Sequence, residues 1–334
     1  MFRRIVFDAI CVVFLLSVLT VALFVAHEET LLNLAQDLVY VMLFLVLGAT
    51  SSWLLDKMKI TTLGGMLFDK KAQDTHSWYR SFWGWQFAVV MVVAIAVSVI
   101  KTQFSVVELL DHNGIAGAVR LFKDLLNPNW EVLPRAVLNI IETIFMAFLA
   151  TSLAIPVAFV LSFFCAKNIM RGPVAYVIYL ALRTVLNVMR SIEALIWAII
   201  FSVWVGIGPF AGMLALMIHS VVSLAKQYSE MVESVEEGPL EAIESTGANK
   251  LQTIWYAIVP QVVLPYISFT LYRWDINVRM ATIIGLVGGG GIGTMLIQYQ
   301  GQAMWREVGC IIAVIAVVVW ALDQASAYIR EALK

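Results

Sequence analysis

Ionisable side chains inside apolar runs are the residues of this sequence best suited to chemistry. The apolar run at 260–287 holds Arg273, Asp275, Asn277 and Arg279 near its middle, and Arg190 interrupts an earlier run. An ionised group at membrane depth costs about 2.5–3.5 kcal/mol to insert, so it faces a bundle interior or a watery path. Two interpretations stay open: these groups line the path of an anion, or they form a charge lattice that holds helices together.

The spacing of these charged residues places them on two different faces of one helix. Asp275 and Arg279 are four residues apart and can form an ion pair, whereas Arg273 lies on a different face. Arginines outnumber acids four to three at the deep positions (Arg183, Arg190, Arg273 and Arg279 against Glu142, Glu193 and Asp275). A slight cationic surplus suits an oxyanion, because a pore must bind its ligand well enough to admit it and weakly enough to release it.

A glycine run follows this charged segment directly. It has neither the lysine nor the preceding strand of a phosphate-binding loop. Glycine lets the backbone bend and approach other backbone closely. The run therefore predicts either a gate at the outer mouth of the path or a simple turn there, formed by Gly288, Gly289, Gly290 and Gly291.

Other kinds of chemistry have no support in the sequence. P-loop, zinc-protease and serine-hydrolase motifs are absent, so we expect no enzyme activity from the chain alone. Cys11, Cys165 and Cys310 have neither disulfide nor metal-ligand spacing. His219 has no second metal ligand near it in sequence, so we expect it to be packed or hydrogen-bonded. We predict no cofactor and no metal, and the net charge of −1 indicates no nucleic-acid partner.

Membrane helices must position these residues. Of the 334 residues, 61% are hydrophobic and only 13% are charged, where soluble domains have about a quarter charged. The mean hydropathy is +0.87. The composition therefore predicts an all-α polytopic membrane protein.

We predict eight membrane passes, since a pass needs roughly 20 mainly apolar residues. Residues 174–189 are expected to be an amphipathic approach along the inner interface. Residues 106–126 are either a helix lying on the outer leaflet or an exposed linker helix. The expected passes are residues 5–26, 37–55, 83–100, 136–166, 191–205, 211–228, 260–287 and 308–322.

The distribution of cations sets the expected orientation. The loop at 56–80 carries Lys57, Lys59, Lys70, Lys71 and Arg80, and such loops stay in the cytoplasm. An even number of passes then puts both termini in the cytoplasm. The polar segment at 237–260 falls on the same side.

This polar segment predicts a helix, a turn and a second helix outside the bilayer. Gly238 is expected to break the preceding helix, and Pro239 suits the first turn of a new one. Gly247 is expected to end the first short helix in a left-handed turn. Pro260 then starts the next pass.

The segment resembles the EAA loop of permease subunits in bacterial ABC importers. It reads Glu241-Ala242-Ile243, then three residues and Gly247, and it closes on Val259-Pro260. Departures from the family pattern at 243, 257 and 259 keep an apolar surface. In that family the loop docks on the ATPase subunit. The resemblance therefore implies coupling through Glu241, Ala242, Glu244, Gly247, Ala248 and Lys250.

Within these importers the chain from about 136 to 333 looks most like the phosphonate-type (PhnE-like) permease subunit. The segments VWVGIGPFAGMLALMIHS, EGPLEAIESTGANKLQ and LYRWDINVRMATIIGLVGGGGIG carry the resemblance. The chain departs from the family's Arg-Ser-Ile-Pro-Glu at 190–194. The implied fold is a type I, MetI-like transmembrane domain at 77–334, with six core helices, preceded by two extra helices at 1–76.

The resemblance implies a permease in the bacterial inner membrane that imports phosphonates or a related small phosphorus oxyanion. Its implied partners, besides membrane lipid, are a second copy of itself in a homodimer, two ATP-binding subunits and an extracytoplasmic substrate-binding protein. An alternative is a secondary transporter of small anions, which needs none of these subunits.

Overall fold

A computed structural model describes residues 5–15, 34–58, 60–68, 78–170 and 172–332. All regular elements among these residues are helices. The chain divides into two compact units, Met1–Gly114 and Ile115–Lys334.

A buried carboxylate organises the N-terminal unit. Asp8, on the apolar helix Ile5–Leu15, accepts a hydrogen bond from Ser52 Oγ of α2 (Leu34–Lys57) at 2.9 Å. Its other oxygen accepts from the Gly64 N–H of α3 (Leu63–Phe68) at 2.8 Å. At Gly48 a Cβ would lie 2.8 Å from the Ala9 Cα, so only glycine allows this helix approach. The next helix is α4 (Phe82–Lys101).

The helices cover the described parts of the passes predicted in this unit. Helix α2 covers 37–55 and α4 covers 83–100. Part of the first predicted pass, at 16–26, and the cations Lys59, Lys70 and Lys71 lie outside the described residues. The single surface helix predicted at 106–126 was wrong. Two helices form, α5 (Val106–Leu109) and α6 (His112–Leu125), because the Asp111 carboxylate caps the start of α6 by accepting from Asn113 and Gly114.

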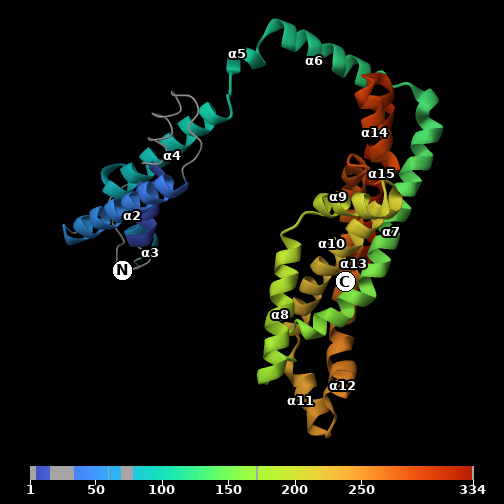
Figure 1. Cartoon of the computed structure of the whole chain (residues 1–334). Helices are drawn as coiled ribbons and strands as arrows, with labels where there is room; N and C mark the ends of the chain where they lie inside the picture. The colour runs from blue at the N-terminus through green and yellow to red at the C-terminus, as the bar shows by residue number, and fades with distance from the viewer. Residues whose placement is uncertain (1–4, 16–33, 59, 69–77, 171, 333–334) are drawn as a thin grey trace. The chain divides into compact units, whose positions relative to one another are not determined.

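The C-terminal unit is a bundle of long helices (Figure 1). Helices α8 and α9 bend by 88° at the residues between them. Counted as one pass, this pair joins five other helices in the described chain that are long and apolar enough to cross a membrane. The elements after α6 are the short 3-10 helix η2 (Trp130–Val132), α7 (Leu133–Phe164), α8 (Pro173–Arg190), α9 (Ala194–Val205), α10 (Pro209–Glu233), α11 (Glu237–Ser245), α12 (Lys250–Thr253), the π segment η3 (Ile254–Ile258), α13 (Val259–Gly285), α14 (Gly291–Gly301) and α15 (Trp305–Ala332).

The structure differs from the prediction at two places in this unit. Pro260 lies in the first turn of α13, as predicted, but the helical segment begins earlier, because it runs from Lys250 through η3 into α13. The stretch between the glycine run and 308 contains α14, which was not predicted. The first turn of α14 is buried because Ile292 and Met295 pack against Ile140 of α7 and Ile311 of α15.

Small residues let α7 and α10 approach closely. Ala147 and Ala150 of α7 are fully buried against Ala211 and Ala215 of α10 in one apolar cluster that also includes α9 and α13. Close packing of small residues is a principal source of helix association in membranes, where apolar burial between helices gains little over lipid.

Asn277 joins α13 to both of these helices. Its Nδ2 donates to Thr151 Oγ1 of α7 at 2.8 Å and to Ser220 Oγ of α10 at 2.7 Å, and the residue is fully buried. Both bonds therefore lie at the junction of three helices.

We predict that Asn277→Ala lowers the stability of the bundle by about 1 to 2 kcal/mol, since interhelical hydrogen bonds in membranes contribute up to roughly 1.7 kcal/mol each. Thermal unfolding of the purified complex in detergent measures the change. Asn113→Ala, on the exposed surface of α6, is the matched control. Equal melting temperatures for both variants would contradict the role of Asn277.

Candidate functional site

The segment at 237–260 folds as the predicted helix, turn and helix. Helix α11 ends at Ser245, and Gly247 follows with φ +82°, the left-handed conformation that favours glycine. Asn249 then caps α12: its Oδ1 accepts from Gln252 N–H at 3.0 Å, and Gln252 Oε1 accepts from Asn249 N–H at 2.8 Å. This α11–α12 hairpin projects at one end of the C-terminal unit (Figure 1).

The hairpin presents an exposed surface. The predicted coupling residues Glu241, Ala242, Glu244, Gly247 and Lys250 are exposed. Ala248 is half-buried. Helix α11 has no fully buried residue; Leu240 packs against the bundle, and the rest of the helix surface is largely exposed.

The predicted helix break at Gly238 was wrong. Helix α10 already ends at Glu233, and Glu236 is the N-cap of α11. The Glu236 N–H donates to Gln261 Oε1 at 3.0 Å, which fixes the entry to the hairpin. Gly238 and Pro239 therefore lie inside the first turn of α11.

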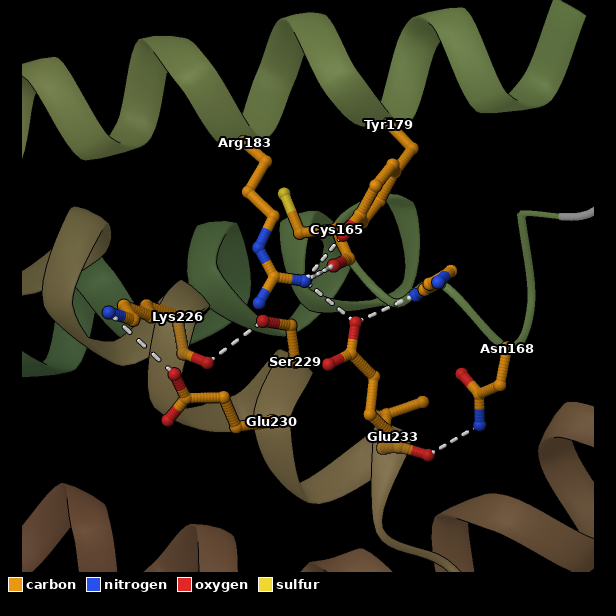
Figure 2. Close-up of polar contacts among 10 residues, drawn as sticks. Cys165, Asn168, Tyr179, Arg183, Lys226, Ser229, Glu230 and Glu233 are labelled. Carbon is orange, nitrogen blue, oxygen red and sulfur yellow. Dashed lines mark hydrogen bonds and ion pairs between the residues drawn. The ribbon is translucent and has the colours of Figure 1, made fainter. Parts of the chain in front are cut away.

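An ion pair holds the end of α10 that leads into the hairpin (Figure 2). Glu233 Oε1 accepts from Arg183 Nη1 of α8 at 2.7 Å and from the Lys167 N–H at 2.9 Å. Asn168 Nδ2 donates to the Val232 carbonyl at 2.7 Å. The last turn of α10 is thus tied both to α8 and to the turn between α7 and α8.

Tyr179 completes this arrangement, which we call the Arg183–Glu233 clamp. Its hydroxyl lies 2.8 Å from Arg183 Nη1, and the guanidinium carbon lies 5.4 Å from the ring centroid. Sequence reasoning counted Arg183 among the deep arginines but missed Glu233. No signal could have found the pair, because 50 residues separate its members.

The charges on α13 separate into paired and unpaired groups. Arg279 Nη2 lies 2.6 Å from Asp275 Oδ2, which confirms the predicted ion pair. Asp323 of α15 adds a second carboxylate at 3.7 Å. Asp323 was missed because the predicted last pass ended at 322. A cavity of about 380 Å³ beside Arg279 and Asp323 lies between α13 and α15.

Arg273 differs from Arg279 in having no acidic partner in the described part of the chain. It is 8% exposed, and its Nε donates to no acceptor. Arg190, the last residue of α8, is exposed.

The glycine run forms a tight turn between α13 and α14. Gly288, Gly290 and Gly291 have φ +91°, +79° and +67°. The Gly288 carbonyl accepts from the Gly208 N–H at 2.9 Å. A Cβ on Gly290 would lie 2.7 Å from Pro209. Gly289 has no positive φ, but its carbonyl oxygen lies against Gly212 of α10. This turn is therefore packed against the turn between α9 and α10.

Beside this turn lies a cavity of about 470 Å³, lined by Arg135, Glu142 and Tyr299 among others. Glu142 Oε1 accepts from the Gly291 N–H at 3.2 Å, and Thr143 Oγ1 accepts from the Ile292 N–H at 2.9 Å. These bonds satisfy two of the free N–H donors at the start of α14. Whether the turn opens as a gate stays a prediction. Within the described residues, no group of three or more His, Cys, Asp or Glu side chains can hold a metal.

The described part of the C-terminal unit thus combines apolar helices long enough to cross a membrane with an exposed helical hairpin. Residues 135–333 match the family model described as "Binding-protein-dependent transport system inner membrane component". The chain belongs to this family. It is an inner-membrane transport component of ABC importers and not an enzyme in its own right, and the assignment favours the importer over the secondary transporter. Importers of this family work with an ATPase and a substrate-binding protein.

Curated relatives and solved structures agree with this assignment. The chain is 33% identical over 246 residues to the phosphite transport system permease protein PtxC of Stutzerimonas stutzeri, covering 72% of this chain and 88% of that protein. It is 34% identical over 217 residues to the phosphate-import permease protein PhnE of Mycolicibacterium smegmatis, covering 65% of this chain and 40% of that protein. The fold is similar to a chain of the MetNI methionine ABC transporter in an inward-facing conformation. That likeness has a TM-score of 0.54 at 20% identity and covers 62% of this chain and 99% of the other. It confirms the MetI-like fold.

We predict that Gly247→Val uncouples ATP hydrolysis from transport, because a β-branched residue in the left-handed region costs about 1 to 3 kcal/mol. Space around Gly247 is open, so the strain comes from the backbone alone. Substrate-stimulated ATPase activity of the assembled transporter measures it. Gly301→Val, also in open space but without a positive φ, is the control. Normal substrate stimulation of the ATPase activity in Gly247→Val would contradict the prediction.

We predict a measurable coupling energy within the Arg183–Glu233 clamp. Its side chains are 30% and 27% exposed, so after allowance for solvent screening we expect about 1 kcal/mol. Thermal unfolding of Arg183→Gln, Glu233→Gln and the double variant gives this energy as a double-mutant cycle. The Lys226–Glu230 pair on α10 is the control, because its atoms are 3.7 Å apart and more exposed. Additive effects at the clamp would show that the pair does not hold α10.

Proposed function

We propose that this chain is the membrane permease of an ATP-driven importer of small phosphorus oxyanions, of the phosphonate, phosphite or phosphate class. Family membership together with the exposed α11–α12 hairpin carries the proposal. The class of substrate is supported by the two relatives named for phosphite and phosphate transport. We propose that an external binding protein selects the particular ligand.

The hairpin is the proposed contact with the ATPase subunit. Its exposed residues Glu241, Ala242, Glu244 and Lys250 are free to meet a cleft on that partner, and Gly247 is the proposed pivot. One hairpin per chain requires two permease chains for two ATPase subunits. We therefore propose a homodimer, and pairing with a related permease is the alternative. A hairpin facing the ATPase also implies cytoplasmic termini at both ends of the chain.

The proposed path of the anion runs past Arg273 and Arg190. The buried, unpaired guanidinium of Arg273 supports this choice. The ion pair of Asp275 with Arg279 and the bridging bonds of Asn277 favour a role in holding α13 to its neighbours. We propose the turn at Gly288, Gly289, Gly290 and Gly291 as the gate on the outer side.

Uptake by the reconstituted transporter tests the function. Liposomes containing the permease and its ATPase, with the binding protein outside, are expected to accumulate phosphite, phosphate or a phosphonate only when ATP is inside. Uptake without the ATPase or without ATP would overturn the importer. If an assembled complex with ATPase activity takes up none of the three anions, the proposed class of substrate is overturned.

We predict that Arg273→Lys lowers phosphite uptake per assembled complex, since a lysine point charge cannot reproduce the guanidinium fork. Arg279→Lys keeps the ion pair with Asp275 and is the matched control. It is expected to change uptake per complex little. Normalised uptake equal to the original protein in Arg273→Lys would end the proposal that Arg273 lines the path.

A further inference from the structure

Helix α6 has an exposed apolar face. Ile115, Val119 and Phe122 follow one another at intervals of four and three residues, which places their side chains on one side of the helix. Leu126 continues the row, because its N–H donates to the Phe122 carbonyl at 2.9 Å and adds a further helical turn. All four residues are exposed, and Phe122 is 62% exposed. We call these four residues the α6 apolar face.

The other side of α6 is polar and basic. Asn113, Arg120 and Lys123 lie there, and all three are exposed. Lys123 is one turn beyond Val119, so it lies at the border between the polar side and the α6 apolar face. A lysine at such a border keeps its methylene stem on apolar surroundings while its charged amine reaches a polar layer. An apolar face beside a basic one is typical of helices that lie in the plane of a membrane surface.

Contacts with α15 fix the position of the end of α6. A Cβ on Gly309, in the first turns of α15, would collide with the Leu125 carbonyl, so the two backbones touch. Beyond α6, the Asn129 N–H donates to the Arg306 carbonyl at 3.0 Å. The Arg306 Nε donates in turn to the Asn127 carbonyl at 3.1 Å. The end of α6 therefore lies beside the first turns of a helix that is long and apolar enough to cross a membrane.

Two tryptophans mark the level of the membrane surface at this place. Two of the stretches that can cross a membrane begin at Trp130 and at Trp305. Trp130 is exposed and follows Leu126 by four residues. Indole rings gather at the boundary between lipid chains and water, because they are large and apolar but carry one N–H donor. The α6 apolar face is therefore held close to this boundary.

Helix α6 and the α11–α12 hairpin lie at opposite ends of the C-terminal unit. Residues 115–125 of α6 belong to this unit. In Figure 1, α6 leaves one end of the unit and the hairpin projects from the other. With the hairpin in the cytoplasm, as proposed above, α6 is on the outer side of the membrane. Only this choice of leaflet rests on the proposed function.

We propose that α6 lies in the outer surface of the phospholipid bilayer, with the α6 apolar face among the lipid chains and Lys123 beside the phosphates. Helices of this kind bury their apolar face about 5–10 Å into the boundary between headgroups and chains. The positive charges of Arg120 and Lys123 complement the negative phosphates of the lipid. Because the end of α6 touches α15, α6 is an anchor that holds the outer end of α15 at a fixed depth.

Spin labels on α6 test this contact in the full chain, purified with its ATPase subunit and placed in vesicles of phosphatidylethanolamine and phosphatidylglycerol. Single labels are attached to Phe122→Cys on the apolar face and to Arg120→Cys on the polar side as the matched control. The native cysteines Cys11, Cys165 and Cys310 are buried and give little background. Oxygen concentrates in lipid, whereas a neutral nickel chelate stays in water. The label at 122 is expected to collide mainly with oxygen, and the label at 120 mainly with the chelate.

Each other outcome overturns the proposal. Collision mainly with the nickel chelate at both positions makes α6 a linker helix in water. A label at 122 that is shielded from both reagents means that a protein, such as a second copy or the binding protein, covers the apolar face. If Phe122→Cys does not assemble, Val119→Cys reports on the same face. The measurement needs no substrate, so its result is independent of whether the transporter takes up phosphite.

A charge placed on the apolar face gives a second test. Val119→Asp in the labelled Phe122→Cys chain is expected to lower the collision rate with oxygen and to raise the rate with the nickel chelate, because an ionised carboxylate is unfavourable among lipid chains. Asn113→Asp adds the same charge on the polar side and is expected to leave both rates unchanged. Equal collision rates in the Val119→Asp and Asn113→Asp chains would show that the apolar face is not in lipid.

Discussion

Polar groups inside a membrane bundle need partners within the protein, and the junction of α7, α10 and α13 supplies two acceptors for the Nδ2 of Asn277. Asn277 bonds at once to Thr151 of α7 and Ser220 of α10. Alanines around it, among them Ala147 and Ala215, bring the helix backbones close. Because the apolar effect between helices is weak in lipid, this junction fixes the position of α13. The position of α13 in turn sets the positions of the charged side chains on that helix.

Two helices, α13 and α10, connect this junction to the α11–α12 hairpin. Helix α13 continues through η3 and α12 to the hairpin as one helical segment from Lys250 to Gly285, with the π segment η3 directly before α13. Helix α10 enters the hairpin from the other side, and Glu233 ties its last turn to Arg183 of α8. A movement of the hairpin therefore reaches both α13, which carries Arg273, and α8, which carries Arg190.

Features determined by local geometry could be predicted from the sequence, and those determined by tertiary packing could not. Gly247 follows from the left-handed turn that only glycine adopts at low cost, and the Asp275–Arg279 pair follows from a spacing of four on one helix. The Arg183–Glu233 clamp depends on how α8 lies against α10, which periodicity does not encode. Helix α14 was missed because a short apolar helix and an external loop look alike beside a glycine run.

The central claim is that ATP-driven movement enters the bundle through the α11–α12 hairpin. Site-directed cross-linking in the assembled transporter tests it most directly, because Cys11, Cys165 and Cys310 are all buried and give little background. A cysteine introduced by Glu241→Cys should cross-link to the ATPase subunit, and the yield should change when ATP is added. Cross-linking from Arg306→Cys at the start of α15, with none from Glu241→Cys, would contradict the account.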